Sequence, residues 1–334
     1  MSSAPPLIFA PGESGELATA VARQSGIELA PLEDQAFEEG EFKLRPLVSV
    51  RDRSVFVVQS LAASPDVAVS QRLIRLLFLL FGLRDAGASR VTAVVPYLSY
   101  ARTDRRTQLR DPVNTRYVAQ LLETTGLDRL VCLDVHNPAA LDNAFRIPVD
   151  HLSAIPMFVR HFAERLGDDD LAVASPDVGG IKRAQIFREM LSAQLRRDVD
   201  MVFVEKRRTQ GAVSGGAVVG ASTGRTVIVI DDLCASGETL LRAATALREA
   251  GAKTIHVAFT HAPLARGLLA VAASKDITSL VTTDSVGPET TRAVTNTATL
   301  TKLHMAPLLG EAIRHMVAGA PLAPLLNRWP PIGS

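Results

Sequence analysis

A near-repeat within the sequence places the same helix-to-strand unit in both halves of the chain. The residues LRDAGASRVTAVVPY begin at Leu83, and the residues LREAGAKTIHVAFTH begin at Leu247. Each copy reads as a helix end, a glycine suited to cap that end, and an apolar run typical of a buried strand. Any two helix–strand units look partly alike, but the shared Leu-Arg-acid-Ala-Gly-Ala favours a duplication of two α/β halves.

Segments typical of strands and of helices alternate along nearly the whole chain, which predicts mainly parallel sheets flanked by helices. The length of 334 residues suggests about two domains. We place their boundary after Asp150, giving one domain over residues 1–150 and a second over 151–334, whose last helix could pack back on the first. The expected strands span residues 55–58, 91–95, 130–133, 171–174, 201–204, 227–230 and 255–259, and the expected helices span 16–24, 70–85, 115–124, 155–166, 181–195, 239–250 and 305–316.

Charge, hydropathy and cysteine content limit the partners and the cellular compartment that we expect for the chain. The formal net charge of +1 gives no support for long-range attraction to nucleic acid or to an anionic membrane. The longest apolar run, residues 73–83, is interrupted by Arg75 and is too short to span a membrane. Two cysteines, Cys132 and Cys234, are too few for a disulfide framework and fit a reducing compartment. We therefore expect a cytoplasmic protein.

The segment TVIVIDDLCASGET, residues 226–239, predicts a ligand-binding corner. Its aliphatic residues 227–230 are typical of a buried strand, Asp231 and Asp232 follow, and a loop of small residues, 235–239, opens a helix. In parallel sheets, ligands bind at the carboxyl ends of strands, and a helix N-terminus presents free N–H groups to anions. We predict that the loop binds a phosphate and that the two acids bind the group that carries it. An ordinary strand–turn–helix with solvated acids is the alternative.

Other expected strand ends also carry polar motifs. Residues 96–106, PYLSYARTDRR, offer aromatic faces and arginines for phosphate oxygens, or else form a solvated basic loop. His136 and Asp177 follow two further strands; taken alone, the first reads as a structural histidine and the second as a helix cap. The cations of EKRR, residues 205–208, precede small residues at 209–216, where we expect no packed structure and therefore a flexible flap.

Taken together, these motifs resemble those of the ribose-phosphate pyrophosphokinases. The acid pair with its loop is similar to the ribose-phosphate loop that this family shares with the phosphoribosyltransferases. The resemblance runs from about Leu17 to Met316, which is nearly the whole chain. The matching segments are FEEGE at 37–41, PYLSYARTDR at 96–105, DVH at 134–136, SPDVGG at 175–180, KRR at 206–208 and APLLGEAI at 306–313.

The resemblance implies an α/β fold of two duplicated phosphoribosyltransferase-like domains, each a mainly parallel sheet flanked by helices. It also implies a reaction in which the β,γ-pyrophosphoryl group of Mg²⁺-ATP passes to the 1-hydroxyl of ribose 5-phosphate. The products would be 5-phosphoribosyl 1-pyrophosphate and AMP. The first domain would contribute to the ATP site, and the second would carry the ribose-5-phosphate loop and the catalytic flap.

Roles for single residues follow from the same resemblance. Lys206 and Arg208 would be catalytic, and His136 and Asp177 would bind Mg²⁺. The implied ATP-binding residues are Phe37, Glu39, Gly40, Glu41, Arg102, Thr103 and Asp104. The implied ribose-5-phosphate-binding residues are Arg208, Asp231, Asp232, Ala235, Ser236, Gly237, Glu238 and Thr239.

Some residues depart from the family's pattern. Ala235 and Glu238 replace an Asp and a Gly of the phosphate loop, and Thr103 replaces a Gln of the ATP motif. We expect Glu238 to point outward, since only its backbone N–H would be needed. The departures keep open a non-catalytic regulatory homologue that binds active synthetase subunits and, less favoured, a phosphoribosyltransferase. The segment 37–41 implies self-association as a dimer or hexamer, and Cys234 beside the loop predicts sensitivity to oxidation.

Overall fold

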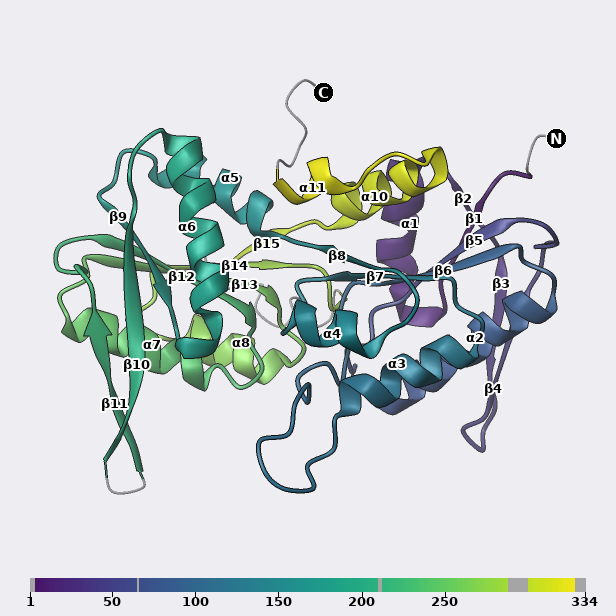
Figure 1. Cartoon of the computed structure of the whole chain (residues 1–334), viewed down its shortest axis with the longest axis horizontal. Coiled ribbons are helices and arrows are strands. Elements are labelled where there is room, and N and C mark those ends of the chain that lie inside the picture. Colours follow the sequence, from purple (N-terminus) through teal and green to yellow (C-terminus); the bar gives the residue numbers. More distant parts are fainter. Residues whose placement is uncertain (1–3, 65, 210–211, 288–299, 328–334) are drawn as a thin grey trace. The chain divides into compact units, whose positions relative to one another are not determined.

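The computed structural model describes residues 4–64, 66–209, 212–287 and 300–327 (Figure 1). Within this part the chain forms two compact units. The first contains the chain up to Ser153, residues 285–287 and the segment from His304 onward, and the second contains Ala154–Asp284 and the strand that precedes His304. The chain therefore leaves the first unit and later returns to it. The sequence predicted the boundary after Asp150 and allowed the last helix to pack back on the first domain.

The first unit is built on a parallel sheet with the strand order β2-β1-β5-β6-β7-β8. Helices α2 and α3 lie on one face of this sheet, and α1 and α10 pack together on the other (Figure 1). An antiparallel hairpin, β3 with β4, contacts α2. The strands are β1 (Leu7–Phe9), β2 (Glu28–Leu29), β3 (Leu32–Ala36), β4 (Phe42–Pro46), β5 (Ser54–Val58), β6 (Arg90–Val95), β7 (Arg129–Leu133) and β8 (Val149–Leu152), and the helices are α1 (Gly15–Ser25), α2 (Val69–Asp85), α3 (Asn114–Thr124), α4 (Pro138–Ala144), α10 (Ala306–Ala318) and α11 (Ala323–Asn327).

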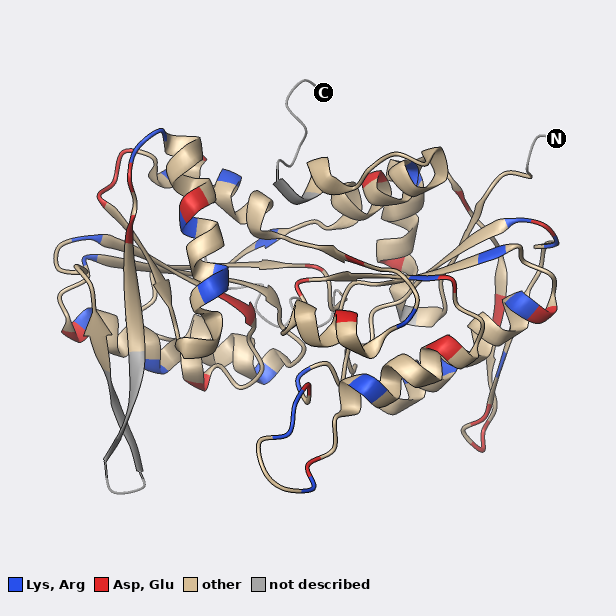
Figure 2. Cartoon of the chain, in the orientation of Figure 1, with Lys and Arg blue, Asp and Glu red and all other residues tan. Residues whose placement is uncertain are grey.

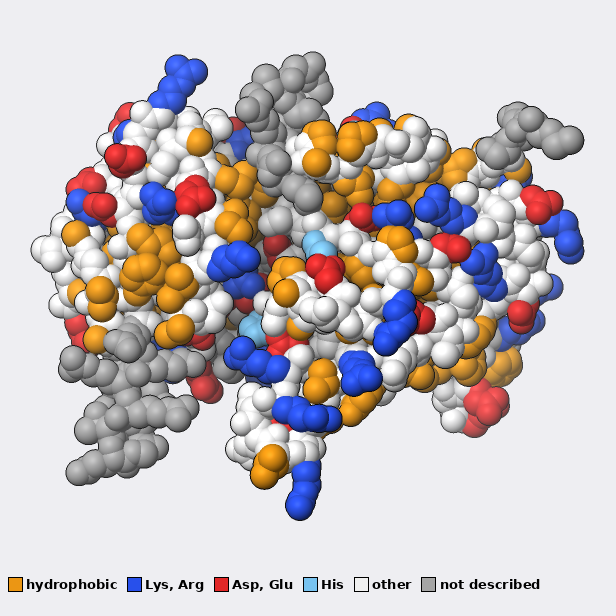
Figure 3. Space-filling model, viewed as in Figure 1, with side chains coloured by type: hydrophobic (Ala, Val, Ile, Leu, Met, Phe, Trp, Pro, Cys, Tyr) orange, Lys and Arg blue, Asp and Glu red, His pale blue; other side chains and the backbone are white. Residues whose placement is uncertain are grey.

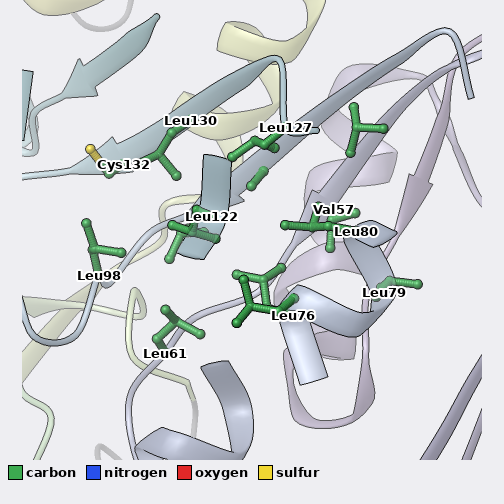
Figure 4. Close-up of a cluster of buried hydrophobic side chains, with 14 of the residues drawn as sticks. Val57, Leu61, Leu76, Leu79, Leu80, Leu98, Leu122, Leu127, Leu130 and Cys132 are labelled. Carbon is green, nitrogen blue, oxygen red and sulfur yellow. The ribbon is translucent and has the colours of Figure 1, made fainter. Parts of the chain in front are cut away.

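The core of the first unit forms where the leucine-rich α2 meets the sheet. Leu76, Leu79 and Leu80 of α2 are inaccessible to solvent and lie in one cluster with Val57 of β5 and Leu130 of β7 (Figure 4). Full burial of a leucine side chain contributes about 1.5–3 kcal/mol. The central strands read as continuous apolar runs because both of their faces are covered by helices. This core fixes the carboxyl ends of the strands, where the predicted ligand motifs lie.

The second unit has a larger sheet with the order β11-β10-β9-β12-β13-β14-β15, parallel except for the β10–β11 pair. Helices α5 and α6 cover one face, and α7 and α8 cover the other (Figure 1). The strands are β9 (Leu171–Ser175), β10 (Asp200–Thr209), β11 (Ala212–Val219), β12 (Thr226–Leu233), β13 (Thr254–His261), β14 (Ser279–Thr283) and β15 (Leu300–Leu303), and the helices are α5 (Ile155–Leu166), α6 (Ile181–Leu195), α7 (Glu238–Glu249) and α8 (Ala265–Ala272).

The segment predicted to be a flap without packed structure is instead a β-hairpin. β10 continues to Thr209, well past the predicted end at residue 204, and pairs antiparallel with β11 from Phe203↔Val219 to Thr209↔Ala212. Residues 210–211 lie outside the described residues. The prediction was wrong because small residues carry little strand signal of their own. β11 is a strand because its backbone pairs with β10, which its own sequence does not indicate.

The structure contains the duplication that the near-repeat predicted. Both sheets include the same order of parallel strands, β1-β5-β6-β7-β8 and β9-β12-β13-β14-β15. At the repeated motif, Arg84 and Arg248 each donate from Nη1 to the carbonyl oxygens four and five residues later. The glycine between, Gly87 or Gly251, adopts a positive φ in both copies. The repeated arginine therefore fastens the end of a helix to the start of the next strand.

A buried histidine makes the stability of the second unit depend on pH. His161 of α5 is 7% exposed and packs edge-on against Phe162, which also meets His256 of β13. Burial, aided by nearby Arg165, lowers the pKa of His161 from 6.5 to about 4. Between these two values the unfolded chain binds more protons than the folded chain, so the free energy of unfolding falls as pH falls.

We expect His161→Phe to flatten this loss of stability. Urea unfolding at pH 7.5 and at pH 5 measures it: the wild type should lose more stability between the two pH values than the variant does. Above pH 7 both the folded and the unfolded histidine are neutral, so the slope there should be equal. Equal losses in both proteins between pH 7.5 and 5 would contradict the assignment of this proton to His161.

Candidate active site

The second unit gathers its acidic pair at the carboxyl edge of the sheet. Asp231 and Asp232 lie within β12, which runs to Leu233 rather than ending at residue 230 as predicted. Asp232 is 5% exposed, and Asp231 is partly buried. Arg183 of α6 approaches both acids, with its Nη1 3.2 Å from Oδ1 of Asp231 and 3.1 Å from Oδ1 of Asp232. The acids are therefore not the solvated pair of the alternative interpretation.

The electrostatics of this pair are dominated by burial. Burial raises the pKa of the Asp231 carboxyl well above its ordinary value, and the neighbouring charge of Asp232 raises it further. The guanidinium of Arg183 acts in the opposite direction and lowers it. A pKa perturbed by burial and by a like charge at a sheet edge is typical of a functional site.

The predicted phosphate loop lies directly beside the acids and opens α7. Gly237 adopts φ +82° at the N-terminal end of this helix. Ser236 and Glu238 are exposed, as expected for Glu238, and the Glu238 N–H donates to Oγ of Ser236. The first N–H groups of a helix have no partner within the helix, so this end of α7 presents donors to an anion. Local geometry thus fits a bound phosphate.

Helix α8 supports the loop through a close backbone approach. A Cβ atom on Gly267 would lie 2.7 Å from the carbonyl carbon of Ala235 and closer still to its oxygen. A Cβ atom on Gly237 would lie 2.7 Å from Cγ2 of Val271. Sequence reasoning missed both α8 and Gly267. The available signal was a glycine inside the helical pattern ARGLLAVA, where it costs stability and so points to close packing.

Cys234 precedes the loop in an environment that contradicts the predicted sensitivity to oxidation. The residue is 1% exposed, and its backbone N–H donates to the carbonyl of His261. Burial, aided by the charge of Asp231, raises the pKa of the Cys234 thiol to about 12. Because the thiolate is the reactive species, the thiol is inert at neutral pH.

Asp177 stands at the next strand end, in the turn between β9 and α6. Its Oδ1 accepts from the N–H groups of Gly179 and Gly180 at 2.9 and 3.2 Å, so the side chain caps the short helix Val178–Gly180. The hydroxyl of Ser175 donates to the carbonyl of Asp177. Asp177 is thus a helix cap, as the alternative interpretation predicted. The same hydrogen bonds fix the direction of its carboxylate at the edge of the sheet where ligands are expected.

In the first unit, the predicted ATP residues Arg102, Thr103 and Asp104 lie in the loop between β6 and α3. The carbonyl of Thr103 accepts from the N–H and the hydroxyl of Thr115 at the start of α3. Oδ2 of Asp104 accepts from Nδ2 of Asn137 at 2.8 Å. Asn137 also caps α4, since its Oδ1 accepts from the Ala140 N–H. Sequence reasoning missed the hydrogen bond between Asn137 and Asp104, because the two residues are far apart in the sequence and no local pattern connects them.

The predicted ATP residues Phe37, Glu39, Gly40 and Glu41 lie elsewhere on the first unit. They form the exposed tip of the β3–β4 hairpin, where the Phe37 N–H donates to the Glu41 carbonyl and Gly40 adopts φ +91°. This tip lies apart from the loop that precedes α3 (Figure 1). The unit therefore does not bring the two predicted groups of ATP residues together by itself.

The remaining predicted site residues are the catalytic and metal-binding ones, and the structure shows which element carries each. Lys206 and Arg208 lie on β10, opposite Gly216 and Val213, with a register irregularity between them. His136 is exposed after β7 in the first unit, whereas Asp177 belongs to the second. Across the described residues, no group of three or more His, Cys, Asp or Glu side chains is arranged to hold a metal ion.

The surface carries charges of both signs. Lys and Arg side chains are interspersed with Asp and Glu on the face shown in Figure 3, and basic residues mark the loop before α3 (Figure 2). None of the described helices is both long and apolar enough to cross a membrane.

Comparison with known proteins extends the similarity to almost the whole chain. Residues 7–126 match the model of the N-terminal domain of ribose phosphate pyrophosphokinase, and residues 149–292 match the phosphoribosyl transferase domain. The ribose-phosphate pyrophosphokinase of Listeria ivanovii is 35% identical over 321 residues, covering 96% of both chains. That of Granulibacter bethesdensis is 37% identical over 310 residues, covering 92% of this chain and 96% of the relative.

The chain belongs to the ribose-phosphate pyrophosphokinase family.

A solved structure supports the same conclusion. The phosphoribosylpyrophosphate synthetase of Mycobacterium smegmatis superposes with a TM-score of 0.85 at 32% identity, covering 95% of this chain and all of that one. The predicted family, the enzyme class and the fold of two phosphoribosyltransferase-type parallel-sheet domains are confirmed. In the second unit, the acid pair, the loop 235–239 and the helix cap Asp177 all lie where strands of this fold end.

Proposed function

We propose that this pyrophosphokinase transfers the β,γ-pyrophosphoryl group of Mg²⁺-ATP to the 1-hydroxyl of ribose 5-phosphate, releasing AMP. The observation that carries the proposal is the juxtaposition of the Asp231–Asp232 pair with the loop 235–239 at the start of α7. A sugar phosphate needs both: donors for its phosphate and acceptors for its hydroxyls. This corner supplies them within one continuous segment of chain.

The sugar binds through complementary hydrogen bonds. Backbone N–H groups of residues 235–239, with the hydroxyls of Ser236 and Thr239, donate to the 5-phosphate. The carboxylates of Asp231 and Asp232 accept from the 2- and 3-hydroxyls, and hydrogen bonds to ionised acceptors are stronger than neutral ones. Both contacts hold the ring and fix the direction of its 1-hydroxyl. Positioning of this kind supplies much of the catalysis in phosphoryl transfer.

The nucleotide binds at the first unit. Arg102 provides a guanidinium for phosphate oxygens, and Asp104 is held in place by its hydrogen bond from Asn137. Because the hairpin tip 37–41 lies apart from these residues within the unit, we propose that the tip of a second copy completes the ATP site. The enzyme would then work as a dimer or a larger oligomer.

Mg²⁺ is the cofactor we propose, bound by His136 and Asp177. Asp177 offers an oriented carboxylate, the type of ligand that this hard cation prefers, and Mg²⁺ sites with few protein ligands take the rest from water and phosphates. When bound, the ion neutralises charge on the polyphosphate. Lys206 and Arg208, on β10, would stabilise the negative charge that builds as AMP leaves. The free cysteines Cys132 and Cys234 support a reducing, cytoplasmic setting.

The proposal is tested by AMP formation from ATP in Mg²⁺, with and without ribose 5-phosphate. Sugar-dependent AMP, equimolar with 5-phosphoribosyl 1-pyrophosphate, is the expected result. No AMP from folded protein that still binds both substrates would indicate the regulatory homologue instead. Consumption of 5-phosphoribosyl 1-pyrophosphate with a nucleobase, without ATP, would indicate a phosphoribosyltransferase.

A further inference from the structure

An arginine outside every motif of the sequence bridges the two acids of the sugar site. Arg183 is the third residue of α6, and one nitrogen, Nη1, lies 3.2 Å from Asp231 and 3.1 Å from Asp232. Its side chain is only 16% exposed, as is that of Asp231, and Asp232 is more deeply buried. The contact is therefore shielded from bulk water, where exposed ion pairs are worth little.

The position of Arg183 in the first turn of its helix is unfavourable unless a nearby acidic side chain stabilises its charge. The first turn of a helix carries a partial positive charge, so cations are normally favoured at the opposite end. Arg188, on the same helix, forms an ion pair with a surface neighbour, Glu189, at 3.5 Å. Arg183 is instead held against the acid pair at this edge of the sheet.

The acids need such a partner because they repel each other. Two adjacent buried carboxylates disfavour each other's ionised form, and a nearby cation opposes this effect. The Asp232 N–H donates to Oδ1 of Asp231 at 2.9 Å, and Arg183 contacts both acids. The nearby thiol of Cys234 stays neutral, because burial and the charge of Asp231 raise its pKa to about 12.

We propose that Arg183 is a positioning residue for ribose 5-phosphate: it holds the carboxylates of Asp231 and Asp232 together as a preformed acceptor for the sugar hydroxyls. This inference rests on the ribose-binding role proposed for the two acids. Arg183 contacts the acids and not the transferred group, so it acts on sugar affinity and leaves the chemical step largely unchanged. Without it, one acid takes up a proton or turns away, and an acceptor is lost.

The test compares Arg183→Met and Arg183→Lys with the wild type, using Arg188→Met as a matched control on the same helix. The Kd of ribose 5-phosphate is measured by calorimetry without nucleotide, and kcat and both KM values are measured by AMP formation. For Arg183→Met we expect the Kd and KM of the sugar to rise about 10–100-fold, as for the loss of a charged hydrogen bond. The KM of ATP and kcat should change less than about threefold. Lysine should restore most of the affinity, and Arg188→Met should behave as wild type.

Two results would overturn the inference. One is an unchanged sugar Kd in Arg183→Met; the other is a loss in kcat with no change in sugar KM. If Arg183→Met does not fold, Arg183→Gln replaces it, with the same rise expected. Asp231→Asn separates the two proposals, since an unchanged sugar Kd in that variant sinks the ribose-binding role of the acids. A raised Kd in Asp231→Asn with wild-type affinity in Arg183→Met sinks the role of Arg183 alone.

Discussion

Replacing Lys206 with alanine is expected to lower kcat for AMP formation by about 10²–10³-fold, the usual effect of removing one preorganised stabiliser of transition-state charge. The KM values for ATP and ribose 5-phosphate should change less than about threefold, because the role proposed for Lys206 is to stabilise negative charge that builds up only after both substrates bind. Lys206 lies on β10, in a paired strand.

The measurement is steady-state AMP formation with saturating ribose 5-phosphate, supported by single-turnover kinetics to isolate chemistry. Lys253→Ala is the matched control, since Lys253 is exposed just before β13, at the opposite end of the strand from the acids' edge of the sheet. Near-normal kcat in Lys206→Ala would remove it from the catalytic group. Equal losses in Lys206→Ala and Lys253→Ala would mean that a general effect of charge is being measured.

A methyl group on Gly267 is expected to raise the KM for ribose 5-phosphate at least about 100-fold, since it would displace the phosphate loop. An added Cβ lies within 2.7 Å of the Ala235 carbonyl carbon, and the obstructing atoms are backbone, which cannot rotate out of the way. Overpacking of this kind costs about 1–3 kcal/mol of stability. The loop is expected to shift by the amount needed to relieve the contact, and its N–H groups then no longer converge on the phosphate.

Gly82→Ala is the control for Gly267→Ala. Gly82 lies inside α2, and nothing stands within 4 Å of an added Cβ there. Alanine at that site should stabilise the protein by up to about 1 kcal/mol, since glycine is costly within helices. The Kd of ribose 5-phosphate is measured by calorimetry and the stability by thermal unfolding, for both variants and the wild type. Wild-type sugar affinity in Gly267→Ala would show that the loop tolerates movement of α8.

Local patterns predicted the elements whose order is local. The helices at 155–166 and 181–195 match α5 and α6 residue for residue, because each has an apolar stripe with clear ends. The strand at 227–230 was predicted from its aliphatic run, although β12 extends through the acids to Leu233. Polar residues such as Asp231 end an apolar pattern without ending a strand.

Features that depend on distant partners could not be predicted. β11 owes its order to pairing with β10, and Gly267 matters because α8 meets Ala235. The bridge from Arg183 to Asp231 joins residues that are 48 positions apart. The sequence therefore predicted roles for residues that lie together in a short motif. It missed residues such as Gly267 and Arg183, whose partners come close only in the folded chain.

The packing of α10 on α1 has a consequence for the order in which the protein is made. A Cβ atom on Gly310 would lie 2.6 Å from Cβ of Gln24, so the last long helix seats closely against the first. During synthesis, the first unit must wait for residues from His304 onward to leave the ribosome, whereas every described strand and helix of the second unit has by then emerged. The unit begun first is the one finished last, and a chain truncated before α10 leaves the matching face of α1 bare, a surface that quality-control proteases and chaperones recognise.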